Sequence, residues 1–363
     1  MRHISIDVLR AAAICLMIVV HFAENLSGST VSGWLPGGMA APIFTLLAGV
    51  SFRLWLRGQE SQGVHESTIT KRAVRRGLFL FGLGVAFNVL VWMPEDTFNW
   101  DVLTLVGSAT LFLTVARHQS PAVLALTAVA VFVAHPFLRE SLEFSTYWTD
   151  GYVDPDMTLS DVLFGYFANG YFPIFPWIIY PVTGFVAADV VFPAAGATPV
   201  SQRPWLCLGT TLAASGLLAM KLRVYTSEQV QKHLLQGWTM FPPSVEYVCW
   251  TLGFAILAIV FAHRWLDNRK WLTADSRLGK IAKTLSRHSL SIYLLHHVVH
   301  LWPLWVYSIV AGHEATHYWR LALPDTISIP LALVCVAFCY GLLRWLERRE
   351  YPTIETLMRW LCD

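Results

Sequence analysis

Ten apolar segments, each about as long as a helix that crosses a bilayer, dominate the 363-residue chain. The hydrocarbon core of a bilayer is about 30 Å thick, and a helix needs roughly 20 apolar residues to cross it. Because a chain inside lipid must satisfy every backbone polar group internally, we expect an all-α, polytopic membrane protein with about ten transmembrane helices. The segments occupy residues 5–24, 38–56, 74–93, 100–117, 120–138, 171–193, 204–222, 244–264, 288–311 and 325–345.

The composition excludes the common alternatives to a membrane protein. Charged residues make up 14% of the chain and apolar residues 55%, whereas an ordinary soluble domain carries about 25% charged residues. Lysine and arginine exceed the acidic residues by only two, so a nucleic-acid partner is not expected. No soluble domain or repeat interrupts the pattern, and residues 1–363 are therefore expected to form a single transmembrane domain in contact with membrane lipids.

The placement of lysine and arginine predicts the orientation, because cytoplasmic loops carry an excess of these residues. With the N-terminus inside, 20 of the 26 lie on the inner side, five on the outer side, and Arg10 within the membrane. Both termini are therefore expected in the cytoplasm, and the protein in the inner (cytoplasmic) membrane of the cell as a multi-pass protein.

Three local features add to this topology. The short connection Arg117–Ser120 predicts a tight hairpin between the fourth and fifth spans. Prolines in the segment 173–181 predict a kinked or broken sixth helix, which is tolerated where a helix lines a cavity. The segment Glu350–Leu361 predicts a short amphipathic helix on the inner membrane surface.

The first span carries four ionisable residues, Asp7, Arg10, His21 and Glu24. At about 100° per residue, Arg10 and His21 lie within roughly 20° of one another, with Asp7 and Glu24 to either side. All four therefore line one face of the helix. Ionisable groups inside a span usually face an interior cavity and mark function.

This polar face predicts acid–base chemistry. Histidine is the side chain most easily poised as a general base near neutral pH, and Glu24 is close enough to orient the ring of His21. Arg10 suits an anionic or carbonyl-bearing ligand. The structural alternative is a histidine and a glutamate wetted by lipid headgroups, with Asp7 and Arg10 as a structural ion pair.

The ninth span contains His296, His297 and His300. His296 and His300 have a spacing that metal ligands use on a helix, which suggests a histidine-box iron enzyme as a rival. Such a site needs several boxes from different segments, and the remaining histidines and cysteines form none. No metal is therefore expected, and His297 and His300 are interpreted as structural histidines.

Short motifs along the chain resemble those of integral-membrane acyltransferases. Asp7-Val-Leu-Arg10 followed by His21 is similar to the Arg-x10-His signature of the acyltransferase-3 type, and Arg72-Ala-Val-Arg75 is similar to the Arg-x-x-Arg before the third span. Further motifs resemble a bacterial branch related to heparan-alpha-glucosaminide N-acetyltransferase, and their order extends the resemblance over nearly the whole chain. They are Ala41-Pro-Ile-Phe-Thr-Leu-Leu-Ala-Gly49, Trp100-Asp-Val-Leu-Thr-Leu-Val-Gly107, Tyr171-Phe-Pro-Ile-Phe-Pro-Trp177 and Ser289-Leu-Ser-Ile-Tyr-Leu-Leu-His296.

The resemblance implies an enzyme that takes an acyl group from cytoplasmic acyl-CoA, with acetyl-CoA as the expected donor. It implies transfer to a hydroxyl or amine on the far side, so the acceptor is expected to be a sugar, a glycolipid or another small molecule. His296 aligns with a histidine of the family's ninth span and is implied to contact the donor thioester. The eukaryotic lysosomal enzyme differs, with Asn at the position of His21 and its histidine in the next loop. Here the loop 25–37 contains no histidine, which favours His21.

The basic residues before the third span predict a phosphate site for the donor. Two guanidiniums at the i,i+3 spacing of Arg72 and Arg75 can clamp a phosphate, and Lys71 and Arg76 flank them. The alternative is the ordinary excess of inner cations. Lys280, Lys283 and Arg287 form a second cation group of the same kind, and no phosphate-loop motif suggests nucleotide hydrolysis.

Two other classes of function stay open beside the acyltransferase. A proton-coupled small-molecule transporter would use the same polar face of the first span, although no inverted repeat supports it. A non-catalytic membrane scaffold would make no use of His21. The acceptor, O- versus N-acylation, acyl length, direct transfer versus an acyl-histidine intermediate, and the oligomeric state (a homodimer included) are left open.

Overall fold

The computed structural model describes residues 2–28, 37–93, 96–142, 147–149, 152–153, 157–194, 196 and 200–363. The chain divides into two compact units, each treated separately below. The first combines Met1–Phe44 with Phe261–Leu361, and the second combines Thr45–Val260 with Cys362 and Asp363. Whether the whole chain acts as the single transmembrane domain that we expect stays a prediction.

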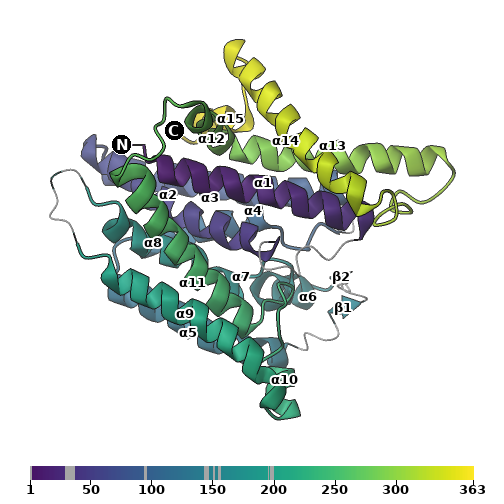
Figure 1. Ribbon diagram of the computed structural model, residues 1–363, viewed down its shortest axis with the longest axis horizontal. Coiled ribbons are helices and arrows are strands. Elements are labelled where there is room, and N and C mark those ends of the chain that lie inside the picture. Colours follow the sequence, from purple (N-terminus) through teal and green to yellow (C-terminus); the bar gives the residue numbers. More distant parts are fainter. Residues whose placement is uncertain are drawn as a thin grey trace. The chain divides into compact units, whose positions relative to one another are not determined.

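Helix α1 is the central element of the first unit and packs against α12, α13 and α14 (Figure 1). It ends at Gly28, whose positive φ of 66° allows its N–H to reach the carbonyls of Ala23 and Glu24. The helices of this unit are α1 (Ile4–Ser27), α12 (Arg277–Arg287), α13 (Ser289–Val310), α14 (Asp325–Arg348) and α15 (Ile354–Cys362), with a π-helical segment His263–Asn268 before α12.

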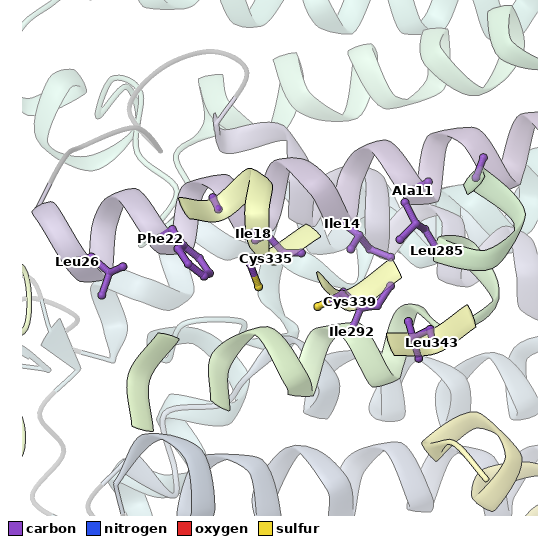
Figure 2. Close-up of a cluster of buried hydrophobic side chains, with 12 residues drawn as sticks. Ala11, Ile14, Ile18, Phe22, Leu26, Leu285, Ile292, Cys335, Cys339 and Leu343 are labelled. Atoms are coloured by element: carbon purple, nitrogen blue, oxygen red, sulfur yellow. The ribbon is translucent and has the colours of Figure 1, made fainter. Parts of the chain in front are cut away.

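A row of apolar side chains on α1 forms the core of the first unit (Figure 2). Their three- and four-residue spacing places them on one face of the helix. In lipid, tight van der Waals packing rather than water exclusion holds such helices together. The row consists of Ala11, Ile14, Ile18, Phe22 and Leu26, and it packs on Leu285 of α12, Ile292 of α13, and Cys335, Cys339 and Leu343 of α14.

The second unit is built mainly from helix pairs, among them α3 with α4 and α5 with α8. Side-chain caps begin several helices: Asp101 accepts from the N–H of Leu103, and Ser120 from that of Val123. The main helices are α2 (Ala40–Ser61, from Thr45 on), α3 (Glu66–Phe87), α4 (Val102–Ala116), α5 (Pro121–Ser141), α6 (Leu159–Phe164), α7 (Ile174–Trp177), α8 (Ile179–Val191), α9 (Arg203–Leu222), α10 (Glu228–His233) and α11 (Val245–Ala262). The strands β1 (Trp148–Thr149) and β2 (Tyr152–Val153) pair with each other in antiparallel orientation.

Glycines allow very close helix contacts in the second unit. A Cβ atom built on Gly49 of α2 would lie 1.9 Å from the Pro181 carbonyl oxygen of α8, and one on Gly184 would lie 2.0 Å from the Leu46 carbonyl oxygen. Small residues at such crossings are characteristic of helix packing in membranes. Gly49 and Gly184 therefore fix how closely α2 and α8 approach.

The structure confirms an all-α membrane protein, and each of the ten predicted segments overlaps a helix. Within the described ranges, seven helices are long and apolar enough to cross a membrane: Ile4–Ser27, Glu66–Trp92, Pro121–Ser141, Leu159–Val191, Arg203–Tyr225, Val245–Asn268 and Asp325–Arg348. Helices α2 and α13 do not meet that criterion, and α4 is shorter. The count of ten spans and the cytoplasmic termini therefore stay predictions.

The broken sixth segment and the C-terminal helix are confirmed, the place of that helix on the inner membrane surface stays a prediction, and one element was not foreseen. The sixth segment is broken, because Phe175 has non-helical backbone angles between α6 and α8. The C-terminal segment is helical but begins at Ile354 rather than Glu350. The amphipathic helix α12 was not predicted, because its charged sequence lies between two apolar segments and contains no long apolar run.

Candidate functional site

Histidines from the two ends of the chain meet where α1 contacts α13. The Nδ1 atom of His21 lies 3.0 Å from Nε2 of His296, and the two rings are nearly parallel, 10° apart. The ring of His297 lies 4.6 Å from that of His21. His296 and His297 are almost completely buried, whereas His21 is half-buried.

Backbone carbonyls determine which ring nitrogens carry protons. The Nδ1 atom of His296 lies 2.9 Å from the carbonyl oxygen of Ile292, which can only accept, so Nδ1 is the donor. In the neutral ring Nε2 of His296 is then an acceptor, and His21 must donate to it through Nδ1–H. It follows that the basic lone pair of neutral His21 is on Nε2.

A second polar contact repeats this arrangement one helical turn further on. Asn25 Nδ2 donates to Nε2 of His300 at 2.9 Å, while His300 Nδ1 donates to the carbonyl of His296. The side-chain oxygen of Asn25 accepts from Trp319 Nε1 at 3.3 Å. Since residue numbers rise together from His21–His296 to Asn25–His300, α1 and α13 run parallel. This agrees with the expectation that they are odd-numbered spans.

The other predicted residues of the first span lie elsewhere along α1. Glu24 is half-buried one turn beyond His21, and its predicted role in orienting that ring stays a prediction. Near the start of the helix, Arg10 Nη1 donates to the hydroxyl of Ser286 on α12 at 3.3 Å. Asp7 is buried and accepts two hydrogen bonds from Arg2, at 2.7 and 3.0 Å.

The predicted phosphate cations lie on the first turns of α3, in the second unit. Arg72 donates to Gln59 at 2.5 Å, and its buried Nε has no hydrogen-bond partner among the described residues. Arg76 forms an ion pair with Asp363 at 2.6 Å and stacks on Trp55. Lys71 and Arg75 are exposed. Arg72 and Arg75 thus offer donors for an anion, whereas Arg76 already has a carboxylate partner.

Two side-chain groups among the described residues have a spacing that could hold a metal ion. Ligand atoms of His21, His296 and His297 lie within 4.8 Å of one another, and so do those of His3, His263 and Asp267. In the second group Asp267 already accepts hydrogen bonds from Ser5 and His263. In the first group, the Nδ1–H groups of His296 and His297 face backbone carbonyls. This arrangement suits the binding of either a metal ion or a proton by the three histidines.

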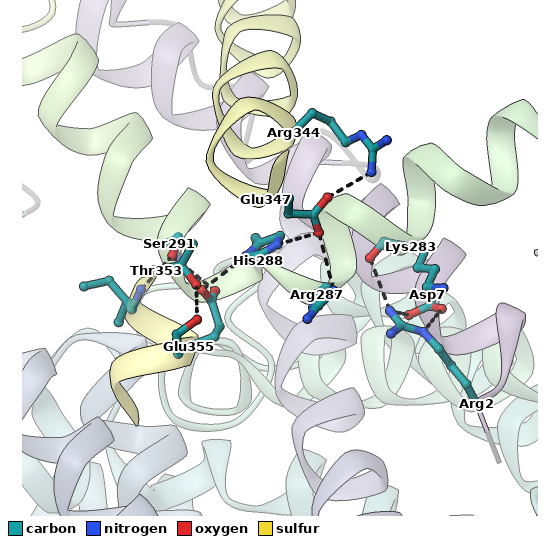
Figure 3. A network of polar contacts seen from close by, with 12 residues as sticks. Arg2, Asp7, Lys283, Arg287, His288, Ser291, Arg344, Glu347, Thr353 and Glu355 are labelled. Atoms are coloured by element: carbon teal, nitrogen blue, oxygen red, sulfur yellow. Dashed lines mark hydrogen bonds and ion pairs between the residues drawn. The ribbon is translucent and has the colours of Figure 1, made fainter. Parts of the chain in front are cut away.

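A separate polar network joins the start of α13 to α14 and α15 (Figure 3). His288 Nε2 lies 2.9 Å from Glu347, and His288 Nδ1 lies 3.6 Å from Glu355. Glu355 also accepts hydrogen bonds from the N–H and hydroxyl of Ser291. Burial lowers the pKa of His288, but these two carboxylates raise it by more, so the pKa lies above its ordinary value. Burial raises the pKa of Glu355. The hydrogen bonds from His288 and Ser291 lower that pKa by more, so it lies below its ordinary value.

The contacts of Asn25 with His300 and with Trp319 were not predicted. The i,i+4 spacing of His21 and Asn25 matches that of His296 and His300, and this shared spacing could have indicated two facing pairs. Trp319 lies in the connection before α14, where no periodic pattern gives its position.

Comparison with known families adds an independent observation. Residues 2–230 match the family model described as heparan-alpha-glucosaminide N-acetyltransferase, catalytic. The matched part contains His21 and the cations of α3, and it ends before α13. No curated protein matches the chain.

Proposed function

Because the chain belongs to the heparan-alpha-glucosaminide N-acetyltransferase catalytic family, we propose that it transfers an acetyl group from acetyl-CoA to a sugar-like acceptor. The acceptor group is a hydroxyl or an amine, and the donor enters from the cytoplasm. The family match supports membrane acetyl transfer. The donor, the acceptor, the residue roles and the inner-membrane location are our proposals.

His21 acts as the general base. Its Nε2 takes the proton from the acceptor as the acceptor oxygen or nitrogen attacks the thioester carbonyl. The tetrahedral intermediate collapses by breaking the carbon–sulfur bond, and the proton passes from His21 to the leaving thiolate, which gives free CoA and the acetylated acceptor. This direct route needs no covalent enzyme intermediate.

The observation that carries the proposal is the contact of His21 with His296. It fixes the His21 tautomer whose Nε2 is basic, and it holds the ring as a carboxylate does in a catalytic triad. We assign His296 to this positioning role. Glu24, one turn away, would stabilise the imidazolium that forms, and Arg10 would contact an anionic or carbonyl-bearing part of a substrate.

The cations of α3 bind the donor phosphates in this proposal. Arg72 and Arg75 are one helical turn apart, and the unpartnered buried Nε of Arg72 supplies a donor for a phosphate oxygen. Lys71 adds an exposed ammonium group. Arg76 contributes positive charge while it remains paired with Asp363.

Calorimetry with the purified full-length protein tests donor binding first. Acetyl-CoA is titrated alongside desulfo-CoA and AMP, with wild type and the Arg72→Gln/Arg75→Gln variant. Micromolar binding that weakens at least tenfold in the variant supports the donor assignment. If neither millimolar acetyl-CoA nor longer acyl-CoAs bind, the donor assignment is contradicted and a proton-coupled transporter is favoured.

Release of free CoA thiol then tests the base. Wild type, His21→Ala and the exposed control His313→Gln are assayed with acetyl-CoA and a panel of amino sugars, sugars and glycolipids. We expect thiol release that depends on acceptor in wild type and control, and its loss in His21→Ala with donor binding retained. Loss of donor binding in His21→Ala would instead place His21 in the donor site.

A further inference from the structure

A basic pocket lies where α12, α14 and α15 meet the start of α13, away from the histidine contact. Its volume is about 560 Å³, within the range of small-ligand pockets. Five lysines and arginines line it, against two glutamates. The cations are Lys280, Lys283, Arg287, Arg344 and Arg359, and we call the cavity the C-terminal basic pocket.

The two acidic groups, Glu347 and Glu350, are too few to neutralise the five lysines and arginines. Glu347 is shared among His288 at 2.9 Å, Arg344 at 2.9 Å and Arg287 at 3.6 Å (Figure 3). Each arginine is anchored on one side while its side chain remains about half exposed. Such anchored guanidiniums are preorganised to donate further hydrogen bonds to an anion.

The lysines on α12 supply charge that has no local partner. Lys280 and Lys283 are exposed, and neither makes an ion pair with any residue in the part of the chain that the structure describes. They are three residues apart, so their side chains share one face of the helix. The pocket therefore has an excess of donors and positive charge that suits a phosphoryl group.

The surroundings of the pocket are typical of a membrane interface. Trp345 and Tyr351 are about half exposed and stack with ring centroids 5.5 Å apart, and such residues are enriched at the level of lipid headgroups. On α15, Thr356 and Arg359 line the pocket while Trp360 is 78% exposed. A short helix with a basic side and exposed apolar side chains suits the headgroup region.

We propose that the C-terminal basic pocket binds the phosphoryl group of an anionic ligand, and the exposed apolar side chains beside it favour the headgroup of an anionic phospholipid. The lysines and arginines hold the phosphate oxygens, and the acyl chains lie along the apolar side chains of α15. The same chemistry would accept a soluble nucleotide phosphate. This site is separate from the cations of α3 and does not depend on the acetyl-transfer proposal.

Native mass spectrometry on the full-length protein tests the lipid source, with phosphatidylglycerol as probe and phosphatidylcholine as the neutral comparison. The pocket variant is Lys280→Gln/Lys283→Gln. The matched control is Arg348→Gln/Arg349→Gln, which removes two exposed charges at the end of α14 that do not line the pocket. A second arm titrates 3′,5′-ADP by calorimetry to test a soluble phosphate.

The expected result is phosphatidylglycerol affinity that falls at least fivefold in the pocket variant and less than twofold in the control. Lys280→Arg/Lys283→Arg, which keeps the charge, should retain binding. A selective loss of 3′,5′-ADP binding instead would support the phosphoryl site and replace the lipid with a soluble ligand. Equal effects of the two double variants in both arms would overturn the proposal. Should the pocket variant fail to fold, the exposed single variant Lys283→Gln gives the same comparison.

Discussion

The ring of His21 on α1 is held by His296 on α13, a residue 275 positions later in the chain, through a 3.0 Å contact between Nδ1 and Nε2. His296 is in turn held by the carbonyl of Ile292. A carbonyl, a buried histidine and a half-buried histidine thus form a chain of hydrogen bonds that ends at the ring of His21. The chemistry that we propose depends on this order.

Replacing His296 should reduce turnover less than replacing His21. Loss of a general base costs about 10²- to 10⁴-fold, whereas loss of a group that orients a metal-bound histidine costs about 10- to 100-fold, and we expect a similar cost here. We expect His296→Phe to lower kcat within the second range, to leave the KM for acetyl-CoA nearly unchanged, and to shift the acidic limb of the pH–rate profile. If the variant changed KM alone, His296 would instead contact the donor.

Arg75→Ala should raise the KM for acetyl-CoA about tenfold or more, because a charge-assisted hydrogen bond contributes about 1.5–3 kcal/mol. S-acetylpantetheine, which lacks the nucleotide, should be used equally well by wild type and variant. Steady-state kinetics with both donors makes the comparison, and Arg269→Gln, another exposed arginine, serves as control. An equal loss of activity with the two donors would contradict a phosphate-binding role for Arg75.

Chelation should leave acetyl transfer unchanged. The three ring nitrogens of His21, His296 and His297 could hold a cation, but our mechanism needs one of them as a base. We expect less than one-tenth of an equivalent of any transition metal in purified protein, measured by elemental mass spectrometry, and full activity after dialysis against EDTA. A stoichiometric metal whose removal abolishes activity would reassign His21 as a ligand.

Stability should depend on pH through His288. A group whose pKa is raised by folding stabilises the folded state. This stabilisation is fully present below the unfolded pKa and is lost as pH rises through the folded pKa. Since the folded pKa of His288 lies above its ordinary value of 6.5, the thermal midpoint of wild type should fall as pH rises from about 6 to 8. The fall should be smaller in His288→Gln. Parallel curves for the two proteins would show that the contacts with Glu347 and Glu355 do not contribute.

Gly49→Ala should destabilise the second unit, because the added methyl group would collide with the Pro181 carbonyl. Overpacking of this kind costs about 1–3 kcal/mol. Gly58 lies on the same helix with nothing within 4 Å of a Cβ atom, so Gly58→Ala is a matched control that should be neutral or slightly stabilising. Thermal midpoints in detergent measure both changes, and equal midpoints would argue against a close α2–α8 crossing.

Hydropathy and spacing predicted the helices well, because a long apolar run in lipid has few alternatives to a helix. The break in the sixth segment also followed from its prolines. The sequence did not predict the start of α15 at Ile354 or the separate helix α12. The boundaries of these helices depend on contacts such as that between Glu355 and Ser291. Short amphipathic helices of this kind are stabilised mainly by packing that a local pattern does not contain.

The candidate site was predicted in part. The polar face of α1 and its histidine could be recognised from spacing alone. The partner of His21 could not, because Glu24 is near in sequence whereas His296 becomes near only when α1 and α13 pack. Sequence reasoning favours local partners for this reason. The resemblance that pointed to His296 implied a contact with the donor, whereas we propose a positioning role.

The division of the chain into units has a consequence for its synthesis. Residues 45–260 of the second unit are contiguous, so they can begin to fold while the ribosome is still translating. The first unit combines both ends of the chain, and α1 reaches the membrane long before α12, α13 and α14 exist. Until those helices arrive, the polar face of α1 lacks the partners that Arg10 finds on α12 and His21 finds on α13. The pairing of His21 with His296 can therefore form only after α13 has been translated.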